Sequence, residues 1–245
     1  MFEEDFTRIR AISQEMGRFS WTSLKYQDDI LQYLIENRDR GHGVIEVGCY
    51  KGGLSALLAH VCKEFKWPFY TIDVDRTAVQ STDELLTVLG LRDCASIHHG
   101  TLASFVKETR LKQAPTLIIL DGDHRYDAVV EDIADTYRLN HRPISAVFHD
   151  YSLRHPTSDE KVDEAVRDSF GDWPVRHIGA QMVGQEEYPT KEKPAEDGHW
   201  WQVPGSEGAI VELPPRINKI SSKKAVQSQT RASFLTRLIG RLHVR

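Results

Sequence analysis

The sequence predicts an α/β fold, a doubly wound parallel sheet with helices on both faces. Three observations support this prediction. Short apolar runs alternate with amphipathic stretches along most of the chain. The runs at 43–48, 69–74, 116–120 and 144–150 are apolar at nearly every position, as in strands that are buried on both faces. Strand–helix–strand order calls for right-handed crossovers, which place helices on both sides of a parallel sheet.

The first strand and helix are the clearest elements. GVIEVG (43–48) is apolar, β-branched and bounded by glycines, as is typical of a strand. The next stretch, 52–65, carries Leu54, Leu57, Leu58 and Val61 at helical spacing, and Pro68 lies just beyond its end. The pair is therefore expected to form a strand, a tight turn and a helix.

The remaining elements follow the same alternation. A weaker third strand is expected at 94–99, and helices are expected at 77–90, 102–111, 126–139 and 159–170. After Gly171 the pattern changes to two late strands, within 174–184 and 208–214, with a polar surface loop at 185–198 between them. Residues 1–42 are expected to be helical, with a core-facing set at Ile30, Leu31, Leu34 and Ile35.

The chain divides into an N-terminal helical segment (1–42), a main domain (43–213) and a basic tail (214–245). The tail holds eight of the 31 Lys and Arg residues and none of the 36 acidic residues. Its first part has the composition of a disordered segment. Residues 232–245 have one apolar helical face and arginines on the other, so they could bind an anionic membrane or a partner groove. A solvated, frayed tail is the alternative.

The composition indicates a cytoplasmic protein. No apolar run is long enough to span a bilayer, and the acidic N-terminus lacks the apolar core of a signal peptide. Three cysteines without metal-binding spacing are expected to be reduced. We expect no nucleic-acid partner, and any contact with the inner membrane surface would come from the tail.

The turn EVGCYKGG (46–53) predicts a cofactor site. Glycines between a strand and a helix let a ligand approach the backbone N–H groups of the helix N-terminus. Tyr50 stands where a dinucleotide motif needs a second glycine after Gly48, and Glu46 would repel a pyrophosphate. An acid would instead attract the amino group of a methionine-derived ligand. The turn, with Gly52 at the helix start, therefore favours S-adenosylmethionine over a dinucleotide.

Two later strand ends extend the predicted cofactor site. Asp73 closes the second strand, where a carboxylate can accept both hydroxyls of an adenosine ribose. Asp75 is the alternative, and one of the two acids is expected to be only a helix cap. Thr101, after the third strand, lies at the edge where an adenine would bind.

Polar side chains follow the fourth and fifth strands. Asp121 ends the fourth strand, and His149 and Asp150 end the fifth. Because the carboxyl ends of neighbouring parallel strands meet, Asp121 and Asp150 could hold a hard cation such as Mg²⁺, with His149 as a further candidate ligand. Asp121 would also lie beside the cofactor. His124, close behind Asp121, could accept a proton near neutral pH. Helix capping for His124 and a loop hydrogen bond for Asp150 are the structural alternatives.

Taken in order, the 46–53 turn, Asp73, the stretch LDGDHRYDAVVEDI (120–133) and FHDY (148–151) resemble class I S-adenosylmethionine-dependent methyltransferases. They are most similar to bacterial sugar and small-molecule O-methyltransferases of the macrolide-sugar and cephalosporin-pathway type, and more distantly to catechol O-methyltransferase. The resemblance covers about residues 40–170.

The resemblance implies a seven-stranded sheet whose last strand is antiparallel. It places the methionine part of the cofactor by Glu46 and Gly48 and the ribose by Asp73. It also implies Mg²⁺ at Asp121 and Asp150 and a base at His124. The chain departs from the relatives at 149–151, where catechol-type enzymes have Asp-Asn for Asp150-Tyr151 and others have Glu-Asp for His149-Asp150.

The expected function is methyl transfer from S-adenosylmethionine to a hydroxyl of a sugar, glycan or small natural product. A nicotinamide-dependent oxidoreductase and a non-catalytic tethering module are the alternatives. Trp21, Trp200, Trp201 and Tyr126 could flank a sugar ring, but we expect them to be core or lid residues.

Overall fold

A computed structural model describes residues 2–157, 160–179, 189–203 and 206–218. The predicted amphipathic segment of the tail and the start of the predicted 185–198 loop lie outside these residues. None of the described helices is long and apolar enough to cross a bilayer.

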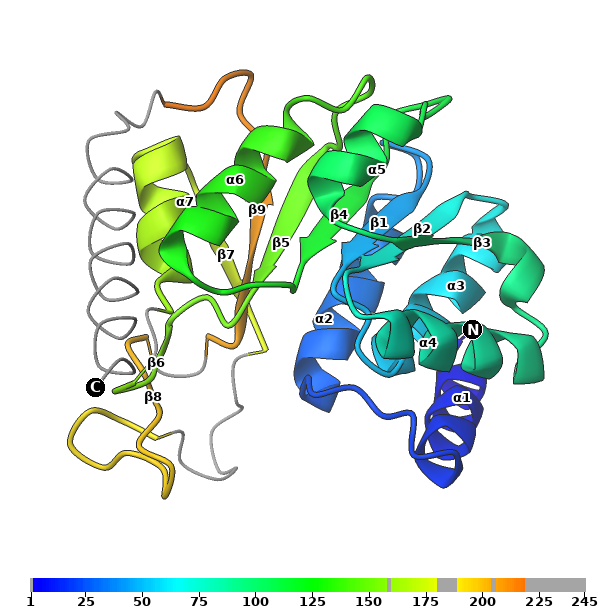
Figure 1. The fold of residues 1–245 in the computed structure, drawn as a ribbon, viewed down its shortest axis with the longest axis horizontal. Helices are drawn as coiled ribbons and strands as arrows, with labels where there is room; N and C mark the ends of the chain where they lie inside the picture. Colours follow the sequence, from blue (N-terminus) through cyan, green and yellow to red (C-terminus); the bar gives the residue numbers. More distant parts are fainter. Residues whose placement is uncertain (1, 158–159, 180–188, 204–205, 219–245) are drawn as a thin grey trace, which may run out of the picture.

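A seven-stranded sheet forms the centre of the molecule, with strand order β3-β2-β1-β4-β5-β9-β7 (Figure 1). Its strands are β1 (Val44–Val47), β2 (Phe69–Asp73), β3 (Ala95–His99), β4 (Leu117–Leu120), β5 (Ser145–His149), β7 (Arg176–Ile178) and β9 (Gly208–Glu212). The first five strands are parallel, in register from Val44 beside Phe69 to Leu120 beside Phe148. β9 runs antiparallel to both of its neighbours, β5 and β7. The antiparallel last strand predicted from the sequence is therefore confirmed.

Helices cover both faces of the sheet. They are α1 (Glu3–Glu15), α2 (Leu24–Glu36), α3 (Gly53–Phe65), α4 (Arg76–Val88), α5 (Leu102–Glu108), α6 (Tyr126–Thr136) and α7 (Val162–Phe170), with a short 3₁₀ turn at Arg92–Cys94. α1 to α4 pack on one face, and α5, α6 and α7 pack on the other (Figure 1). The predicted doubly wound architecture is therefore present.

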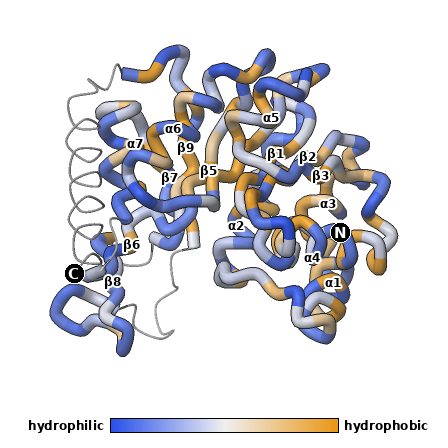
Figure 2. The backbone as a smooth tube through the Cα atoms, viewed as in Figure 1, coloured by the Kyte–Doolittle hydropathy of each residue, from blue (hydrophilic) through white to orange (hydrophobic). Residues whose placement is uncertain are grey.

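Alternating side chains of the strands feed two separate cores. Along β4, Leu117 and Ile119 join the core under α1 to α4, whereas Ile118 and Leu120 join the core under α5 to α7. Figure 2 shows hydrophobic residues concentrated along these central strands. Because both faces are buried, the strands must be apolar at every position, which explains the continuous apolar runs in the sequence.

A two-stranded ribbon was not predicted. β6 (Leu153–Arg154) pairs antiparallel with β8 (Trp200–Trp201), which brings the chain after β5 next to the segment just before β9. Such short strands carry too little periodic signal to be recognised. The ribbon places Trp201 near the carboxyl end of β5, where its side chain lines the cavity.

Ordered contacts continue past the predicted domain end at residue 213. The carbonyl of Pro214 accepts hydrogen bonds from Tyr137 and Arg142, and the backbone N–H of Asn218 donates to Ser169. Residues 214–218 therefore pack against α6 and α7, and a truncation of the tail should begin after Asn218.

Candidate active site

A cavity of about 1410 Å³ opens at the carboxyl ends of the central strands. Among the predicted site residues, those lining it are Glu46, Gly48, Tyr50, Asp73, Thr101, Asp121, His124, His149 and Asp150. Gly52 does not line it. Its φ of +88° lets it precede α3, and a Cβ there would lie 2.9 Å from the Cα of Thr82. Gly52 is therefore the residue at the start of α3, as expected, and its contact with a ligand stays a prediction.

Gly48 allows β1 to end against β4. Its φ is +92°, and a Cβ at this position would lie 2.0 Å from the carbonyl oxygen of Asp121. Only glycine permits this approach, because any side chain would collide with backbone. Gly48 therefore allows the 46–53 turn to lie directly against the backbone of Asp121.

Glu46 is buried, with 1% of its surface exposed. The hydroxyls of Ser55 and Thr71 donate to its Oε2 atom at 2.5 and 2.7 Å. Burial raises its pKa to about 8, although both hydroxyl groups oppose the shift. Glu46 thus joins β1, β2 and α3 and also lines the cavity, and its contact with a cationic group stays a prediction.

Asp73 binds the backbone of the 46–53 turn. Its Oδ2 atom accepts the N–H groups of Cys49 and Tyr50 at 2.9 and 3.2 Å, and Oδ1 accepts that of Asp75 at 2.8 Å. Asp75 caps α4 by accepting the N–H of Thr77. The expectation that one of these acids is a helix cap is confirmed for Asp75, and ribose binding by Asp73 stays a prediction.

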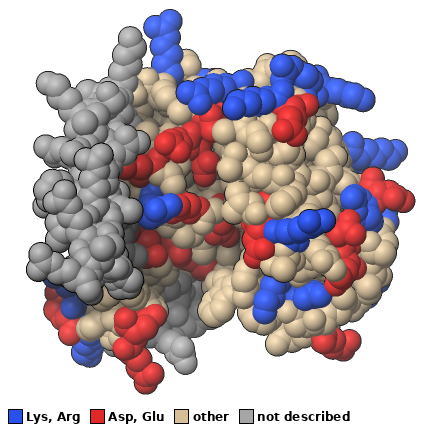
Figure 3. All heavy atoms as spheres, in the orientation of Figure 1, with Lys and Arg blue, Asp and Glu red and all other residues tan. Residues whose placement is uncertain are grey.

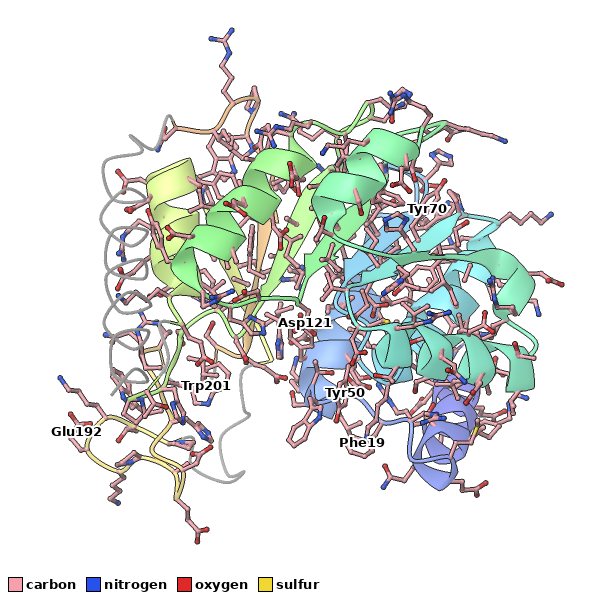
Figure 4. The ribbon with its side chains drawn as sticks, viewed as in Figure 1. Phe19, Tyr50, Tyr70, Asp121, Glu192 and Trp201 are labelled. Atoms are coloured by element: carbon pink, nitrogen blue, oxygen red, sulfur yellow. The ribbon has the colours of Figure 1, made fainter. Side chains whose placement is uncertain are left out.

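Thr101 and Tyr50 also have structural partners. Thr101 is the N-cap of α5 and accepts the N–H of Ser104, so its predicted place near an adenine is shared with a capping role. Tyr50 is 41% exposed with a φ of +50°, and its ring lies near those of Phe19 and Trp21. Figure 4 shows Phe19 and Tyr50 on the same side of Asp121.

The four polar residues predicted at the ends of β4 and β5 do come together. His124 Nε2 lies 3.6 Å from Asp121 Oδ1 and 3.7 Å from Asp150 Oδ2. His149 Nδ1 lies 2.7 Å from Asp121 Oδ1 and 3.6 Å from Asp150 Oδ1. Asp150 adopts a left-handed backbone, with φ +48°, which is uncommon outside glycine and concentrates at functional sites. The cluster thus alternates two imidazoles with two carboxylates.

His149 has a further partner that was not predicted from the sequence. Glu207, which precedes β9, is 6% exposed, and its Oε1 atom lies 3.5 Å from His149 Nε2. Glu207 in turn accepts hydrogen bonds from the backbone N–H and the hydroxyl of Ser23, the N-cap of α2. Burial lowers the pKa of His149, but Asp121 and Asp150 outweigh it and raise that pKa well above its ordinary value. Only the three-dimensional pairing of β5 with β9 shows this contact, because 58 residues separate its two members.

Asp121, His124 and His149 can each bring one ligand atom within 4.8 Å of the others. Two of these three donors are imidazole nitrogens. Mg²⁺ binds oxygen donors and keeps several water molecules, so the buried imidazole of His149 is a poor ligand for it. The residues present therefore fit Mg²⁺ incompletely.

Two tryptophans lie at the cavity. Trp201, on the β6–β8 ribbon, and Trp21, which is 73% exposed, both line it, whereas Trp200 and Tyr126 do not. Figure 4 shows Trp201 on one side of Asp121 and Tyr50 on the other. Trp21 is thus a surface residue and not part of the core. Figure 3 shows acidic side chains gathered beside the hollow on this face.

Residues 45–151 match the family model described as a methyltransferase domain. This match and the sheet topology agree with the resemblance to class I S-adenosylmethionine-dependent methyltransferases. The matched residues run from β1 to the residue after Asp150, so they include the 46–53 turn and the cluster of Asp121, His124, His149 and Asp150. The match favours a methyltransferase over the oxidoreductase alternative.

Solved structures share the fold of the methyltransferase domain. The O-methyltransferase TomG from Streptomyces achromogenes, in complex with S-adenosylmethionine, is 15% identical with a TM-score of 0.52, covering 86% of this chain and 91% of TomG. An O-methyltransferase from Bacillus cereus, in complex with S-adenosylhomocysteine, is 12% identical with a TM-score of 0.51, covering 86% and 90%. Cofactor-bound Rv0187 from MTB is 13% identical with a TM-score of 0.53, covering 85% and 89%. A search of curated proteins finds no significant match.

Proposed function

We propose that this methyltransferase domain transfers the methyl group of S-adenosylmethionine to a hydroxyl of a sugar, a glycan or a related small natural product, with His124 as the proton acceptor. One observation carries the proposal. The Gly48 turn and the Asp121–His124–His149–Asp150 cluster line the same cavity, at adjacent strand ends. A methyl donor bound at the turn would point toward groups that can receive a proton.

The chemistry is an in-line displacement. The acceptor oxygen forms a bond to the methyl carbon while the bond between that carbon and sulfur breaks. The electron pair of the broken bond stays on sulfur, which gives S-adenosylhomocysteine. The acceptor hydroxyl loses one proton, which passes to His124 Nε2. The carboxylates of Asp121 and Asp150, 3.6 and 3.7 Å from that nitrogen, stabilise the resulting imidazolium. The protein supplies alignment, because an oriented encounter removes much of the entropic barrier.

The size and walls of the cavity support a bulky acceptor. A drug-sized ligand usually occupies a pocket of about 300–1,000 Å³. The cavity of about 1410 Å³ therefore has room for an acceptor beside the cofactor. Trp21 and Trp201 offer aromatic faces on which the apolar face of a sugar ring can pack.

Labelled-methyl transfer tests this proposal. The full chain is incubated with methyl-labelled S-adenosylmethionine and a panel of glycans, simple glycosides and hydroxylated natural products. Label in an acid- and base-stable ether product supports the proposal. If S-adenosylhomocysteine binds but no panel member is labelled, the sugar acceptor is wrong. If neither cofactor form binds, the non-catalytic alternative is favoured.

A further inference from the structure

We propose that His149 is a positioning residue for the proposed methyl transfer. As an imidazolium held between Glu207 and Asp121, it fixes the carboxylate that faces His124, and it supplies the positive charge that the family resemblance assigns to a metal ion. The proposal deepens the proposed function and rests on it only for the effect on methyl transfer, because the state of the His149 ring can be measured by itself.

The two ring nitrogens of His149 face carboxylates from different parts of the fold. Nδ1 lies 2.7 Å from Asp121 Oδ1, after β4, and Nε2 lies 3.5 Å from Glu207 Oε1, just before β9. A neutral imidazole has one N–H group, so in either tautomer one nitrogen lone pair would face a carboxylate oxygen. A protonated ring has an N–H group on each side and is attracted by both acids.

The surroundings of His149 favour an ion pair with Asp121. His149 is 6% exposed, and within the described part of the chain its buried Nδ1 atom makes no aligned hydrogen bond. The short contact with Asp121 is therefore electrostatic, and Asp150 Oδ1 adds a second carboxylate oxygen 3.6 Å from the same nitrogen. The fully buried ring of Tyr26 packs 5.0 Å from the imidazole, centroid to centroid, and leaves it little room to rotate.

The cavity offers few cations to the three acids around His149. Among the described residues that line it, Arg125 is the only lysine or arginine, and its Nε atom donates to Asp123 at 2.9 Å. Buried carboxylates are costly unless they are paired or bind a metal. The ring of His149 lies within 3.6 Å of an oxygen of each of the three acids, so one proton on this ring provides a cation for all of them.

Asp121 Oδ1 connects His149 with the proposed base. This one oxygen lies 2.7 Å from His149 Nδ1 and 3.6 Å from His124 Nε2. His124 must be neutral to accept a proton, so it cannot be the permanent cation of the cluster. A fixed charge on His149 holds the oxygen in place before and after His124 takes up the proton. Because both N–H groups of His149 face protein carboxylates, His149 acts through Asp121 and does not contact the acceptor.

Glu207 fixes the far side of the imidazolium. Its carboxylate accepts the backbone N–H of Ser23 at 2.8 Å and also accepts the Ser23 hydroxyl, at the start of α2. The N-terminus of a helix stabilises a carboxylate, so this position keeps Glu207 ionised and in place. The contacts from Ser23 through Glu207 and His149 to Asp121 therefore connect a helix N-terminus with the proposed base.

The imidazolium and a bound metal ion exclude each other at Nδ1. A protonated ring has no nitrogen lone pair, and a metal ion binds histidine only in its neutral form. The state of this nitrogen therefore distinguishes a charge supplied by the chain from a charge supplied by an ion.

Nitrogen NMR of the full chain, labelled in its histidines, tests the state of the ring. The His149 signals are assigned through bonds from its backbone. Near neutral pH both ring nitrogens should carry hydrogen, and neither signal should move when Mg²⁺ is added or when a chelator is added. A neutral tautomer, or a shift of the Nδ1 signal on addition of Mg²⁺, would overturn the proposal.

His149→Gln tests the positioning role. It removes the charge and should lower kcat at least about tenfold, within the loss of about 10² that a misplacement of about 1 Å can cause. The KM for the acceptor and the dissociation constant of S-adenosylhomocysteine should stay nearly unchanged, and thermal shift with this ligand shows that the variant is folded. His177→Gln is the control, because this ring contacts Ser206 and does not line the cavity. Unchanged kcat in His149→Gln would overturn the positioning role.

A double-mutant cycle tests whether Glu207 acts through His149. Glu207→Gln keeps an oxygen that can accept the Nε2–H group but removes the negative charge, so it should lower kcat less than His149→Gln does. Once His149 is replaced, the additional change at Glu207 should have no further effect on kcat. Additive losses would contradict the connection from Glu207 through His149 to Asp121.

The outcomes separate this inference from the proposed function. Methyl transfer to a hydroxyl by a chain whose His149 ring is neutral contradicts the inference and leaves the function standing. A protonated His149 ring in a chain that labels no hydroxyl acceptor supports the assigned charge and contradicts the function.

Discussion

His124 Nε2 lies 3.7 Å from Oδ2 of Asp150, a residue held in a left-handed backbone conformation. A non-glycine residue in this conformation costs on the order of 1–3 kcal/mol, which the surrounding structure must offset. Here the strain places a carboxylate beside the imidazole that we propose as the proton acceptor. The same nitrogen lies 3.6 Å from Asp121 Oδ1, so two carboxylates lie beside this imidazole.

Replacing His124 should therefore affect the chemical step. We expect His124→Gln to lower kcat by roughly 10²–10⁴-fold, the usual contribution of a general base. The dissociation constant of S-adenosylhomocysteine should stay unchanged, because we propose that His124 contacts the acceptor and not the cofactor. His155→Gln is a matched control in the same cavity and should retain activity. Unchanged turnover in His124→Gln would end the assignment.

Gly48 should be intolerant of any side chain. In Gly48→Ala the new Cβ would meet the Asp121 carbonyl at 2.0 Å, at a φ of +92°. We expect a loss of about 2–5 kcal/mol in the free energy of unfolding, from steric overlap and backbone strain together. Urea unfolding measures this loss. Gly90→Ala, at φ +65° with no atom within 4 Å of its Cβ, should cost only about 1 kcal/mol.

Glu46 should make stability depend on pH. Its pKa is about 8 in the folded chain against 4.5 ordinarily, so the folded state binds this proton more tightly than the unfolded state does. The stabilisation is complete below pH 4.5 and is lost as pH rises toward 8. Glu46→Gln stays neutral, so its stability relative to the wild type should rise across this range, by as much as about 4 kcal/mol. Urea unfolding of both chains over a series of pH values measures this change. A difference in the free energy of unfolding that does not vary with pH would show that Glu46 is not responsible.

Trp21 should affect binding of the acceptor more than stability. It is 73% exposed, so Trp21→Ala should change the free energy of unfolding by less than about 0.5 kcal/mol. Loss of an aromatic wall should raise the KM for a sugar acceptor by about three- to tenfold. Trp173, which does not line the cavity, provides the comparison, and Trp173→Ala should leave this KM unchanged. Equal effects of the two variants would argue against an aromatic acceptor wall.

The tail prediction can be tested without disturbing the domain. A chain ending after Asn218 keeps the contacts of Pro214 and Asn218 with α6 and α7. It should bind S-adenosylhomocysteine like the full chain. If the cationic tail contacts membranes, co-sedimentation with anionic liposomes should occur for the full chain and disappear for the truncated one. Equal co-sedimentation of the two chains with the liposomes would show that the tail does not mediate membrane binding.

The sequence was most informative where one physical requirement dominates. Strands buried on both faces must be apolar throughout, so β1, β2, β4 and β5 were predictable from 43–48, 69–74, 116–120 and 144–150. The ends of parallel strands share one edge, so the meeting of Asp121 with Asp150 and His149 followed from topology.

Residues that depend on distant pairing could not be found in this way. Glu207 reaches His149 only because β9 is inserted beside β5, and it reaches Ser23 across 184 residues of sequence. Trp201 lines the cavity because two short strands pair. Gly52 is predicted to contact the ligand, but its positive φ and its closeness to Thr82 would by themselves require a glycine at this position. A glycine pattern alone does not distinguish these two requirements.

Methyl transfer itself tests the central claim most directly. The wild-type chain and His124→Gln are compared for transfer of labelled methyl from S-adenosylmethionine to the acceptor found in the glycan and natural-product panel, at saturating cofactor. The account predicts an O-methyl ether with the wild type and a rate at least about 10²-fold lower with the variant. Equal rates for the two chains, or label on an atom other than a hydroxyl oxygen, would contradict it.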